Sequence, residues 1–344
     1  MSLPCGTYNM SYARDMAIIR TPAQWVMAIA GIAFLFCFPS FIPEGWLDVL
    51  NSTMMLMIAV FGLSIVTGYT GQISIGQAAF MGVGGYTSAV LATNFGFPFW
   101  AALPCAGIMA GLAGLIFGAP SLKVKGLYLA LATLAAQFIL YWVFFHWPYL
   151  GLSMGTRALY PSIAGITLSS TASYFYLVLA LTLLLGIFAK NIVRTRVGRA
   201  FIAIRDNDKA AEGMGINVYN YKLLAFFVGC FYAGIAGSLI AHYNGVANYN
   251  FYTLDESIWM LGMLIVGGLG GIMGAVYGTL FIKLIEQALL MYMPSMGFSL
   301  AVAATLTQIL LGLVIVLFLI FEPRGLQHRW ELFKASYRLW PFSY

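Results

Sequence analysis

The sequence predicts an all-α polytopic membrane protein that crosses the membrane about ten times. Of its 344 residues, 61% are hydrophobic and 8% are charged, and the mean hydropathy of the whole chain is +0.88. Soluble domains contain about 45–50% apolar and about 25% charged residues, so this composition excludes a water-soluble globule. Continuous apolar runs such as Phe175–Ala189 exclude a β-barrel, whose strands alternate apolar and polar residues. Helices are the remaining structure that satisfies a backbone in lipid.

The apolar residues fall into ten stretches, each close to the roughly 20 residues that span a bilayer. A polar tail at 1–22 precedes the first stretch, 23–42, which is too long for a signal-peptide core and lacks a small-residue cleavage site. The predicted membrane domain therefore runs from 23 to 321, and a second tail from 322 to 344. The remaining nine stretches lie near 47–67, 75–94, 98–119, 126–147, 173–189, 222–243, 257–273, 275–293 and 299–321.

The distribution of basic residues predicts that both ends of the chain are cytoplasmic. Short loops rich in Lys and Arg remain on the cytoplasmic side of a membrane. With the N-terminus inside, 15 of the 17 basic residues fall in the two tails, in the turn with Lys123 and Lys125, and in the segment 190–222. The net charge of +6 therefore reports topology and does not indicate nucleic-acid binding. The segment 146–172 is then outside, either as a loop or as a contact surface for an extracytoplasmic partner.

Enzymatic and metal-binding chemistry has little support in the sequence. The four cysteines show no CxxC spacing and there are three histidines, so we predict neither a metal site nor a catalytic residue. No GxxxxGK[ST] loop occurs, which means that the chain has no P-loop nucleotide site of its own. We therefore predict that no cofactor binds this chain.

Two glycine-rich breaks interrupt the apolar stretches. The first runs over Gly68–Gln77 and the second over Gly267–Gly274. Irregular backbone persists inside a membrane where protein or a water-filled cavity satisfies its polar groups, and broken helices recur at substrate sites. We therefore predict that Gln72, Ser74 and Gln77 line a path through the protein. The pair of breaks reflects either an internal repeat or convergence on tight turns.

Other polar and small residues within the spans have expected roles. Gln137 is a further candidate for the path, with interhelical hydrogen bonding as the alternative. Lys283 and Glu286 are three residues apart, where they either pair with each other or lie near the membrane interface. An ion-driven carrier needs acidic groups within the membrane, so one such pair gives ion coupling little support. A stripe of small residues three and four apart predicts close helix packing. It consists of Gly107, Gly111, Gly114 and Gly118.

The cytoplasmic segment 190–222 is expected to contain two short helices. Apolar residues at helical spacing, with arginines on the other faces, predict a basic amphipathic helix over Val193–Arg205 at the membrane surface. The run Asp206–Asp208 offers N-caps for a second, shorter helix, which Gly215 ends. Small residues at such a tip suit insertion into a cleft of another protein, and an ordinary connecting loop is the alternative. The residues expected to face the cytosol are Ala210, Ala211, Glu212 and Met214.

Several motifs occur in the order found in one family of transporters. They are GYTGQISIGQAAFMGVGGYTSAVL at 68–91, KVKGLYLALATLA at 123–135, RTRVGRAFIAIRDNDKAAEGMGINVYNYKLLAF at 194–226, GGLGGIMGAVYG at 267–278 and FEPRGL at 321–326. With these motifs, the chain resembles the second permease subunit of branched-chain amino acid ABC importers over about 60–325. The resemblance implies an ABC importer permease with ten helices, located in a bacterial inner membrane.

The resemblance also implies partners. Such permeases work with a sister permease, an extracytoplasmic solute-binding protein and two cytoplasmic ATPase subunits, which bind the ATP and magnesium, and they contact membrane lipid. The segment Arg205–Ile216 matches the cytoplasmic loop that docks the ATPase in this family. Asp208, Ala211 and Gly215 stand at the matching positions of that loop. The residues that we predict to take part in the coupling are Arg205, Asp208, Ala210, Ala211, Met214 and Gly215.

Two departures from the family pattern concern the solute. Members commonly have His where Gln77 stands, and a Thr-Gly-Gly-x-Asn-Gly-like stretch where this chain has Leu150–Gly155. Branched-chain or other hydrophobic amino acids are the expected solutes, moved by alternating access. Relatives import urea, short amides or aromatic acids, which are the alternatives within the family. An ion-coupled carrier or a channel is the alternative of another class.

Overall fold

The structure is a computed structural model. It describes residues 42–121, 128–150, 154–163, 166–295, 297 and 299–339, together with 26, 29–31, 36 and 39. The chain divides into two units, residues 1–47 and 48–344, and the features below belong to the second unit. The predicted tail at 1–22, most of the predicted first span and the basic turn with Lys123 and Lys125 lie outside the described residues.

A helix occupies each of the nine stretches that the sequence predicts between 47 and 321. These stretches are continuously apolar, and a helix bonds nearly all of its peptide groups within the segment, as lipid requires. The helices are α3 (Glu44–Leu63), α4 (Gln77–Asn94), α5 (Phe99–Ser121), α6 (Tyr128–His146), α7 (Thr171–Arg194), α10 (Val218–Asn244), α11 (Leu254–Gly267), α12 (Ile272–Ser295) and α13 (Leu300–Phe321).

Seven helical segments in the described part of the chain are long and apolar enough to span a membrane, judged by length and composition. The helices α4 and α11 are not among them. The 18 residues of α4 include many glycines and polar groups, and the 14 residues of α11 reach about 21 Å, less than the roughly 30 Å of a hydrocarbon core. The all-α, multi-span fold is confirmed, whereas the count of ten spans and the orientation stay predictions.

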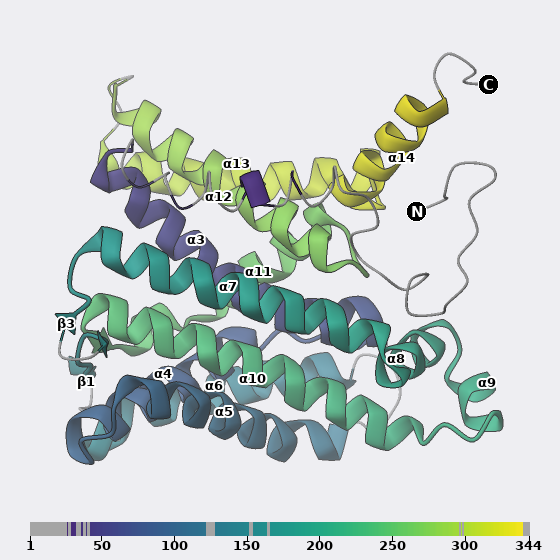
Figure 1. Ribbon diagram of the computed structural model, residues 1–344, viewed down its shortest axis with the longest axis horizontal. Helices are drawn as coiled ribbons and strands as arrows, with labels where there is room; N and C mark the ends of the chain where they lie inside the picture. The colour runs from purple at the N-terminus through teal and green to yellow at the C-terminus, as the bar shows by residue number, and fades with distance from the viewer. Residues whose placement is uncertain are drawn as a thin grey trace. The chain divides into compact units, whose positions relative to one another are not determined.

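The helix α10 packs against both α4 and α5, which also contact each other (Figure 1). Glycines let α4 and α10 approach backbone to backbone. A Cβ atom at Gly84 would overlap the backbone of Gly234, and one at Gly237 would overlap the carbonyl group of Met81. A larger residue at Gly84 or Gly237 would therefore push α4 and α10 apart.

The predicted glycine stripe on α5 also faces α10 and receives large side chains from it. A Cβ atom at Gly107 would lie 2.8 Å from the ring of Phe231, and one at Gly111 would lie 2.6 Å from the ring of Phe227. The packing face is therefore confirmed. The expected close approach of the two backbones is found as well: a Cβ atom at Gly234 of α10 would lie 2.7 Å from the carbonyl oxygen of Ala106 and 3.0 Å from the Cα atom of Gly107.

Short strands lie at one end of the bundle (Figure 1). β1 (Thr156–Arg157) pairs antiparallel with β4 (Val246–Ala247), and β2 (Ser162–Ile163) pairs antiparallel with β3 (Ile166–Thr167). Two 3-10 helices, η3 (Pro148–Leu150) and η5 (Tyr249–Phe251), adjoin them. Within the predicted outer segment 146–172, β1 is therefore paired with the turn after α10.

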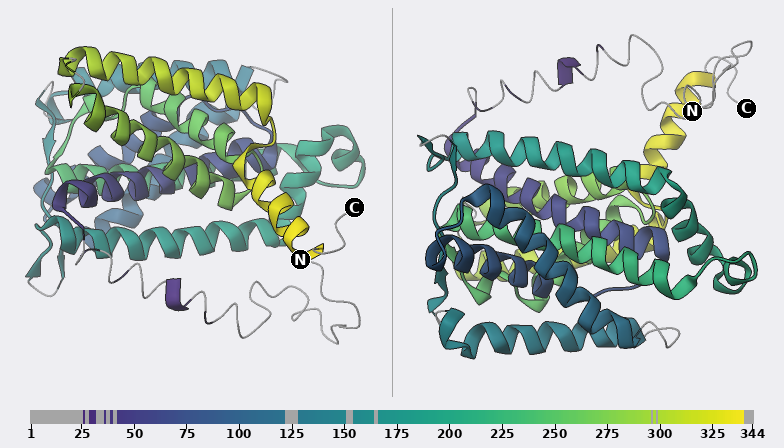
Figure 2. Two further views of the ribbon diagram at one scale, coloured as in Figure 1. Left: turned by 90° about the horizontal axis from the view of Figure 1, so that it is seen from above. Right: turned by 60° about the horizontal axis from the view of Figure 1, so that its bottom comes forward.

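Three helices lie at the opposite end, namely α8 (Arg196–Asp206), α9 (Asp208–Gly213) and α14 (Gly325–Leu339) (Figures 1 and 2). The basic amphipathic helix predicted over Val193–Arg205 is present as α8, but it starts later than predicted, because α7 continues to Arg194 and the chain turns at Thr195. The turn is tight enough that a Cβ atom at Gly198 would overlap the backbone of Val193. The sequence analysis also missed α14 within the predicted second tail.

Candidate functional site

The first break is a real interruption of the helices. A π-helix, η2 (Ser64–Tyr69), ends α3, and the hydroxyl of Thr70 donates to the carbonyl of Val66 at 2.6 Å. Gly71 then takes a φ of +68°, which a residue with a side chain adopts only under strain. Residues 71–76 have no helical structure, and α4 begins at Gln77. The observed interruption thus covers residues 64–76, where the sequence predicts Gly68–Gln77, and from here on the first break means residues 64–76.

The chain re-enters the bundle after the first break. The Gln77 Nε2 atom donates to the carbonyl oxygens of Ala59 at 3.1 Å and Gly229 at 3.2 Å. Ala59 precedes Tyr69 by ten residues, which is about 15 Å along a helix. Residues 70–77 therefore run back beside α3, and α4 starts in the interior of the bundle and not at its end.

Gln137 joins the start of α4 to the segment that precedes α11. Its Oε1 atom accepts hydrogen bonds from the Ala79 backbone N–H at 2.9 Å and the Ser257 hydroxyl at 3.1 Å, and its Nε2 atom donates to the Tyr252 carbonyl at 2.8 Å. The first N–H groups of a helix have no partner within the helix, so a buried start needs such acceptors. Gln137, 1% exposed, supplies one.

Ser257 and Thr133 are site residues that the sequence analysis missed. The Ala78 backbone N–H donates to the Ser257 Oγ atom at 2.9 Å, and the Ile75 N–H donates to the Thr133 Oγ1 atom at 3.0 Å. Thr133 lies one helical turn before Gln137 on α6, so the i, i+4 spacing of two polar residues in an apolar helix was the available signal.

The first break also contains buried polar atoms that have no partner among the described residues. They are Ser64 Oγ, Thr67 Oγ1, Gln72 Oε1 and Ser74 Oγ. Gln72 is 6% exposed and Ser74 is 1% exposed, and the Gln72 Nε2 atom donates to the Lys222 carbonyl at 3.3 Å. Of the four predicted path residues, Gln77 and Gln137 thus bond to neighbouring helices, whereas Gln72 and Ser74 keep buried oxygens available. A lining role for all four stays a prediction.

The second break lies against the first. Gly268 and Gly270 have φ values of +116° and +96°. A Cβ atom at Gly68 would lie 2.7 Å from the backbone nitrogen of Gly270, so the two breaks touch through their backbones. From α14, the Gln327 Oε1 atom accepts a hydrogen bond from the Gly274 N–H at 2.8 Å. The two breaks predicted from the sequence therefore form one junction at the end of the bundle that carries α8 and α14.

The helix α9 has the start and the end that the sequence predicts. Among the three candidates, Asn207 is the N-cap, and its Oδ1 atom accepts hydrogen bonds from the N–H groups of Lys209 at 3.0 Å and Ala210 at 3.1 Å. Gly215 has a φ of +82°, and the Ile216 N–H donates back to the Ala211 carbonyl at 3.1 Å. Together with the bond from the Gly215 N–H to the Glu212 carbonyl at 3.0 Å, this bond forms a Schellman motif, which stops the helix.

The side chains around α9 divide into an exposed and a buried set. Ala210, Glu212 and Met214 are exposed, Met214 by 84%. The expectation that Ala211 also faces the cytosol was wrong, because Ala211 is 2% exposed and faces the rest of the protein. The Asp208 carboxylate pairs with Lys222 on α10 at 2.6 Å, which ties α9 to the bundle.

Arg205 lies at the end of α8 and not on α9. Its Nη1 atom donates to the carbonyl oxygen of Gly68 in the first break at 3.2 Å. Of the residues assigned to coupling, Ala210 and Met214 are therefore exposed on the tip, Asp208 and Ala211 hold α9 in place, Gly215 ends it, and Arg205 turns toward the breaks.

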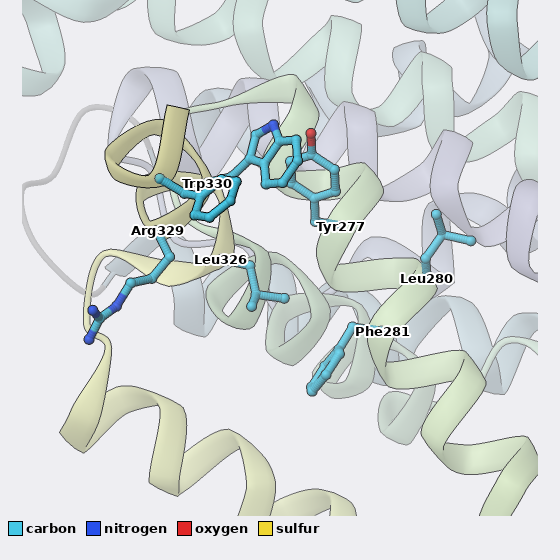
Figure 3. A pocket seen from close by; sticks show the side chains of 7 residues that line it. Tyr277, Leu280, Phe281, Leu326, Arg329 and Trp330 are labelled. Carbon is cyan, nitrogen blue, oxygen red and sulfur yellow. The ribbon is translucent and has the colours of Figure 1, made fainter. Parts of the chain in front are cut away.

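Two cavities lie near α14, and neither is lined by Gln72, Ser74, Gln77 or Gln137. An apolar groove of about 510 Å³ lies between α12 and α14, where Tyr277 and Phe281 face Leu326 and Trp330 (Figure 3). A polar cavity of about 320 Å³ lies between the second break and the start of α14. The predicted path residues are thus enclosed by helices in this conformation.

The predicted ion pair within the spans is confirmed. The Lys283 Nζ atom lies 2.8 Å from the Glu286 Oε2 atom on α12, and both side chains are partly exposed. The two charges compensate each other locally, as expected for an i, i+3 pair.

The chain is similar to known transport proteins. A family model described as a branched-chain amino acid transport system permease component matches residues 45–319. The high-affinity branched-chain amino acid transport system permease protein LivM of Escherichia coli K12 is 27% identical over 89% of this chain and 75% of its own length. The autoinducer 2 import system permease protein LsrC of Salmonella paratyphi B is also 27% identical, over 86% of this chain and 85% of its own length.

A probable branched-chain amino acid transport permease protein LivM of Methanocaldococcus jannaschii is 25% identical over 65% of this chain and 67% of its own length. No solved structure matches the chain. The apolar helices and the family match make the chain a multi-pass protein of the bacterial inner membrane. Because the family model covers most of the sequence, the chain belongs to the family of branched-chain amino acid transport system permease components.

Proposed function

We propose that this chain is a transmembrane subunit of an ATP-driven ABC importer that moves branched-chain or other hydrophobic amino acids by alternating access. The family match and the relatives named as branched-chain amino acid permeases support this solute class. The proposed partners are a sister permease, two cytoplasmic ATPase subunits that carry ATP and magnesium, and an extracytoplasmic solute-binding protein. Membrane lipid surrounds the spans.

The observation that carries the proposal is the placement of α9 at the same end of the bundle as the two breaks. A six-residue helix, capped at both ends, presents Ala210 and Met214 in a chain whose sequence has no P-loop. A rigid tip of small and flexible apolar side chains suits a groove on an ATPase subunit. Motion of that subunit would then reach the breaks through α8, which contacts both α9 and the first break.

For the path, we propose that Gln72 and Ser74 offer hydrogen bonds to the solute. Their buried oxygens have no partner among the described residues, and a buried polar group without a partner costs about 1–3 kcal/mol. A passing solute with ammonium or hydroxyl donors would remove that cost. Gln77 and Gln137 hold the start of α4 beside these residues, so we assign them a positioning role in the path.

The solute is tested in proteoliposomes that contain this chain together with the other subunits of its transport system. We expect ATP-dependent uptake of radiolabelled leucine, isoleucine or valine that persists when ionophores remove the membrane potential and the ion gradients. Uptake that needs no ATP but stops when the ion gradients are removed would establish an ion-coupled carrier instead. Uptake down the gradient of the solute, without ATP and without ion gradients, would establish a channel.

A competition panel in the same assay tests the solute class. Autoinducer 2 is included because the LsrC relatives are named for its import and match a similar share of this chain. Urea, a short amide and an aromatic acid complete the panel. We expect hydrophobic amino acids to compete with labelled leucine at the lowest concentrations. Stronger competition by another solute would reassign the importer to that class.

The coupling role of α9 is tested at its exposed tip. We expect Ala210→Arg to lower solute-stimulated ATP hydrolysis at least about tenfold, because a long charged side chain blocks the groove on the ATPase, while the chain still inserts and purifies normally. Asn220→Arg, on the exposed first turn of α10, is the matched control and should change little. Substitution of Ala211 is not suitable, because its burial means that an arginine there disrupts α9 itself. Wild-type hydrolysis in Ala210→Arg would refute the coupling role.

A further inference from the structure

Arg205 contacts the first break through two parts of its side chain. In addition to the hydrogen bond from Nη1 to the Gly68 carbonyl, its Cγ atom lies 3.2 Å from the position that a Cβ atom of Gly71 would occupy. Gly71 has a positive φ, so this contact needs glycine for its backbone shape as well as for space. The arginine stem therefore fits against a surface made by the backbone of residues 68–71.

The same guanidinium group reaches the second break. A Cβ atom at Gly270 would lie 3.0 Å from the Arg205 Nη1 atom, and a Cβ atom at Gly68 would lie 2.7 Å from the Gly270 backbone nitrogen. One side chain from α8 thus lies where two breaks, separated by about 200 residues of sequence, meet. Removal of this group would leave the Gly68 carbonyl without its charged donor.

The other edge of the guanidinium group pairs with the neighbouring carboxylate. The Arg205 Nε and Nη2 atoms donate to the Asp206 Oδ1 atom at 3.1 Å and 3.0 Å. A planar guanidinium with two donors on a carboxylate leaves Nη1 pointing in one direction, which a lysine ammonium would not reproduce. The helix α9 begins at Asp208, three residues after Arg205, so a displacement of α9 reaches Arg205 through a very short stretch of backbone.

We propose that Arg205 is a positioning residue that fastens the two breaks to α8 and releases them when the ATPase displaces α9. This proposal rests on the proposed function and adds a specific route for the coupling. With Arg205 in place, the Gly68 and Gly270 backbones remain in contact and the polar atoms of the first break stay enclosed. When α9 moves, the guanidinium withdraws, the contact between the breaks loosens, and the buried side chains of Gln72 and Ser74 become accessible from the side of α8.

The first test measures accessibility and does not depend on the solute. In a chain without its four native cysteines and carrying Gln72→Cys, a membrane-impermeant thiol reagent is applied from the side of α8. A hydrogen bond with a charged partner changes an equilibrium constant by about one to two powers of ten. Loss of the bond in Arg205→Gln should therefore shift the first break toward its accessible state and raise the labelling rate of Gln72→Cys about tenfold. The matched control is Arg199→Gln, which removes an exposed arginine from the same helix. Arg205→Lys keeps the positive charge but loses the planar set of guanidinium donors, so its labelling rate should lie between those of the wild type and Arg205→Gln.

The second test measures coupling in the complete reconstituted transporter. We expect Arg205→Gln to lower the number of solute molecules taken up per ATP hydrolysed by about tenfold, because hydrolysis no longer moves the breaks. Arg199→Gln should match the wild type. Unchanged labelling of Gln72→Cys in the Arg205→Gln chain would overturn the proposal. If labelling rises but the wild-type transporter does not import amino acids, the role of Arg205 stands and the proposed solute fails.

Discussion

Gln137→Leu is the sharpest test of how α4 is held inside the bundle. Leucine fills nearly the same volume as glutamine, so the substitution removes hydrogen bonds and leaves no large cavity. The Ala79 N–H and the Tyr252 carbonyl would each lose a bond, at 2.9 Å and 2.8 Å. Each orphaned backbone group costs about 1–3 kcal/mol, whereas side-chain bonds between membrane helices average about 0.6 kcal/mol. Neither backbone group has a helical partner to return to, so we expect a loss of about 2–4 kcal/mol in the free energy of unfolding.

The free energy of unfolding is measured by SDS titration of the purified chain in mixed micelles, followed by tryptophan fluorescence. The control is Gln308→Leu, which makes the same chemical change at an exposed position on α13. We expect that control to change stability by less than about 0.5 kcal/mol, as for other surface sites. A loss in Gln137→Leu no greater than in the control would refute the reasoning, because Gln137 would then not hold the start of α4.

Two further substitutions test the helix packing and the cap of α9. Gly237→Ala places a methyl group against the Met81 carbonyl, so we expect a thermal midpoint lower by several degrees, whereas Gly312→Ala, with no atom within 4 Å of its Cβ, should leave it unchanged or raise it. Equal midpoints would contradict the close approach of α4 and α10. Asn207→Ala removes the cap of α9, worth about 1 kcal/mol, and should speed amide hydrogen exchange in residues 208–213 about fivefold. Exchange at the wild-type rate would show that the cap does not stabilise α9.

The local structure of α9 was predictable because every signal lies within a few residues. The sequence predicted an N-cap within Asp206–Asp208 and Gly215 as the stop, and both ends are made by hydrogen bonds that span two to five positions. The burial of Ala211 was not predictable in the same way. On a helix of six residues, the side that faces the protein depends on how α8 and α10 approach it, and composition carries no record of that approach.

The helix α14 and the turn at Thr195 show two other limits. Leu326, Trp330 and Phe333 recur at helical spacing, so α14 had a signal, but its charged residues gave it the composition of a polar tail. At Thr195 the periodicity of apolar residues runs on from α7 into α8 while the backbone turns. The turn requires the absence of a side chain at Gly198, a steric condition that hydrophobic periodicity does not report.

The sequence by itself determined the membrane class, the nine helices from 47 onward, the two breaks and the family, because hydropathy, glycine content and motifs are properties of consecutive residues. Only the tertiary structure decided which polar residues of other helices contact the breaks and the start of α4. Gln137 joins α4 to the segment before α11, and Arg205 lies where Gly68 meets Gly270. Hydrogen bonds and van der Waals contacts act over a few ångströms in space, so partners that lie far apart in the sequence become visible only once the helices are packed.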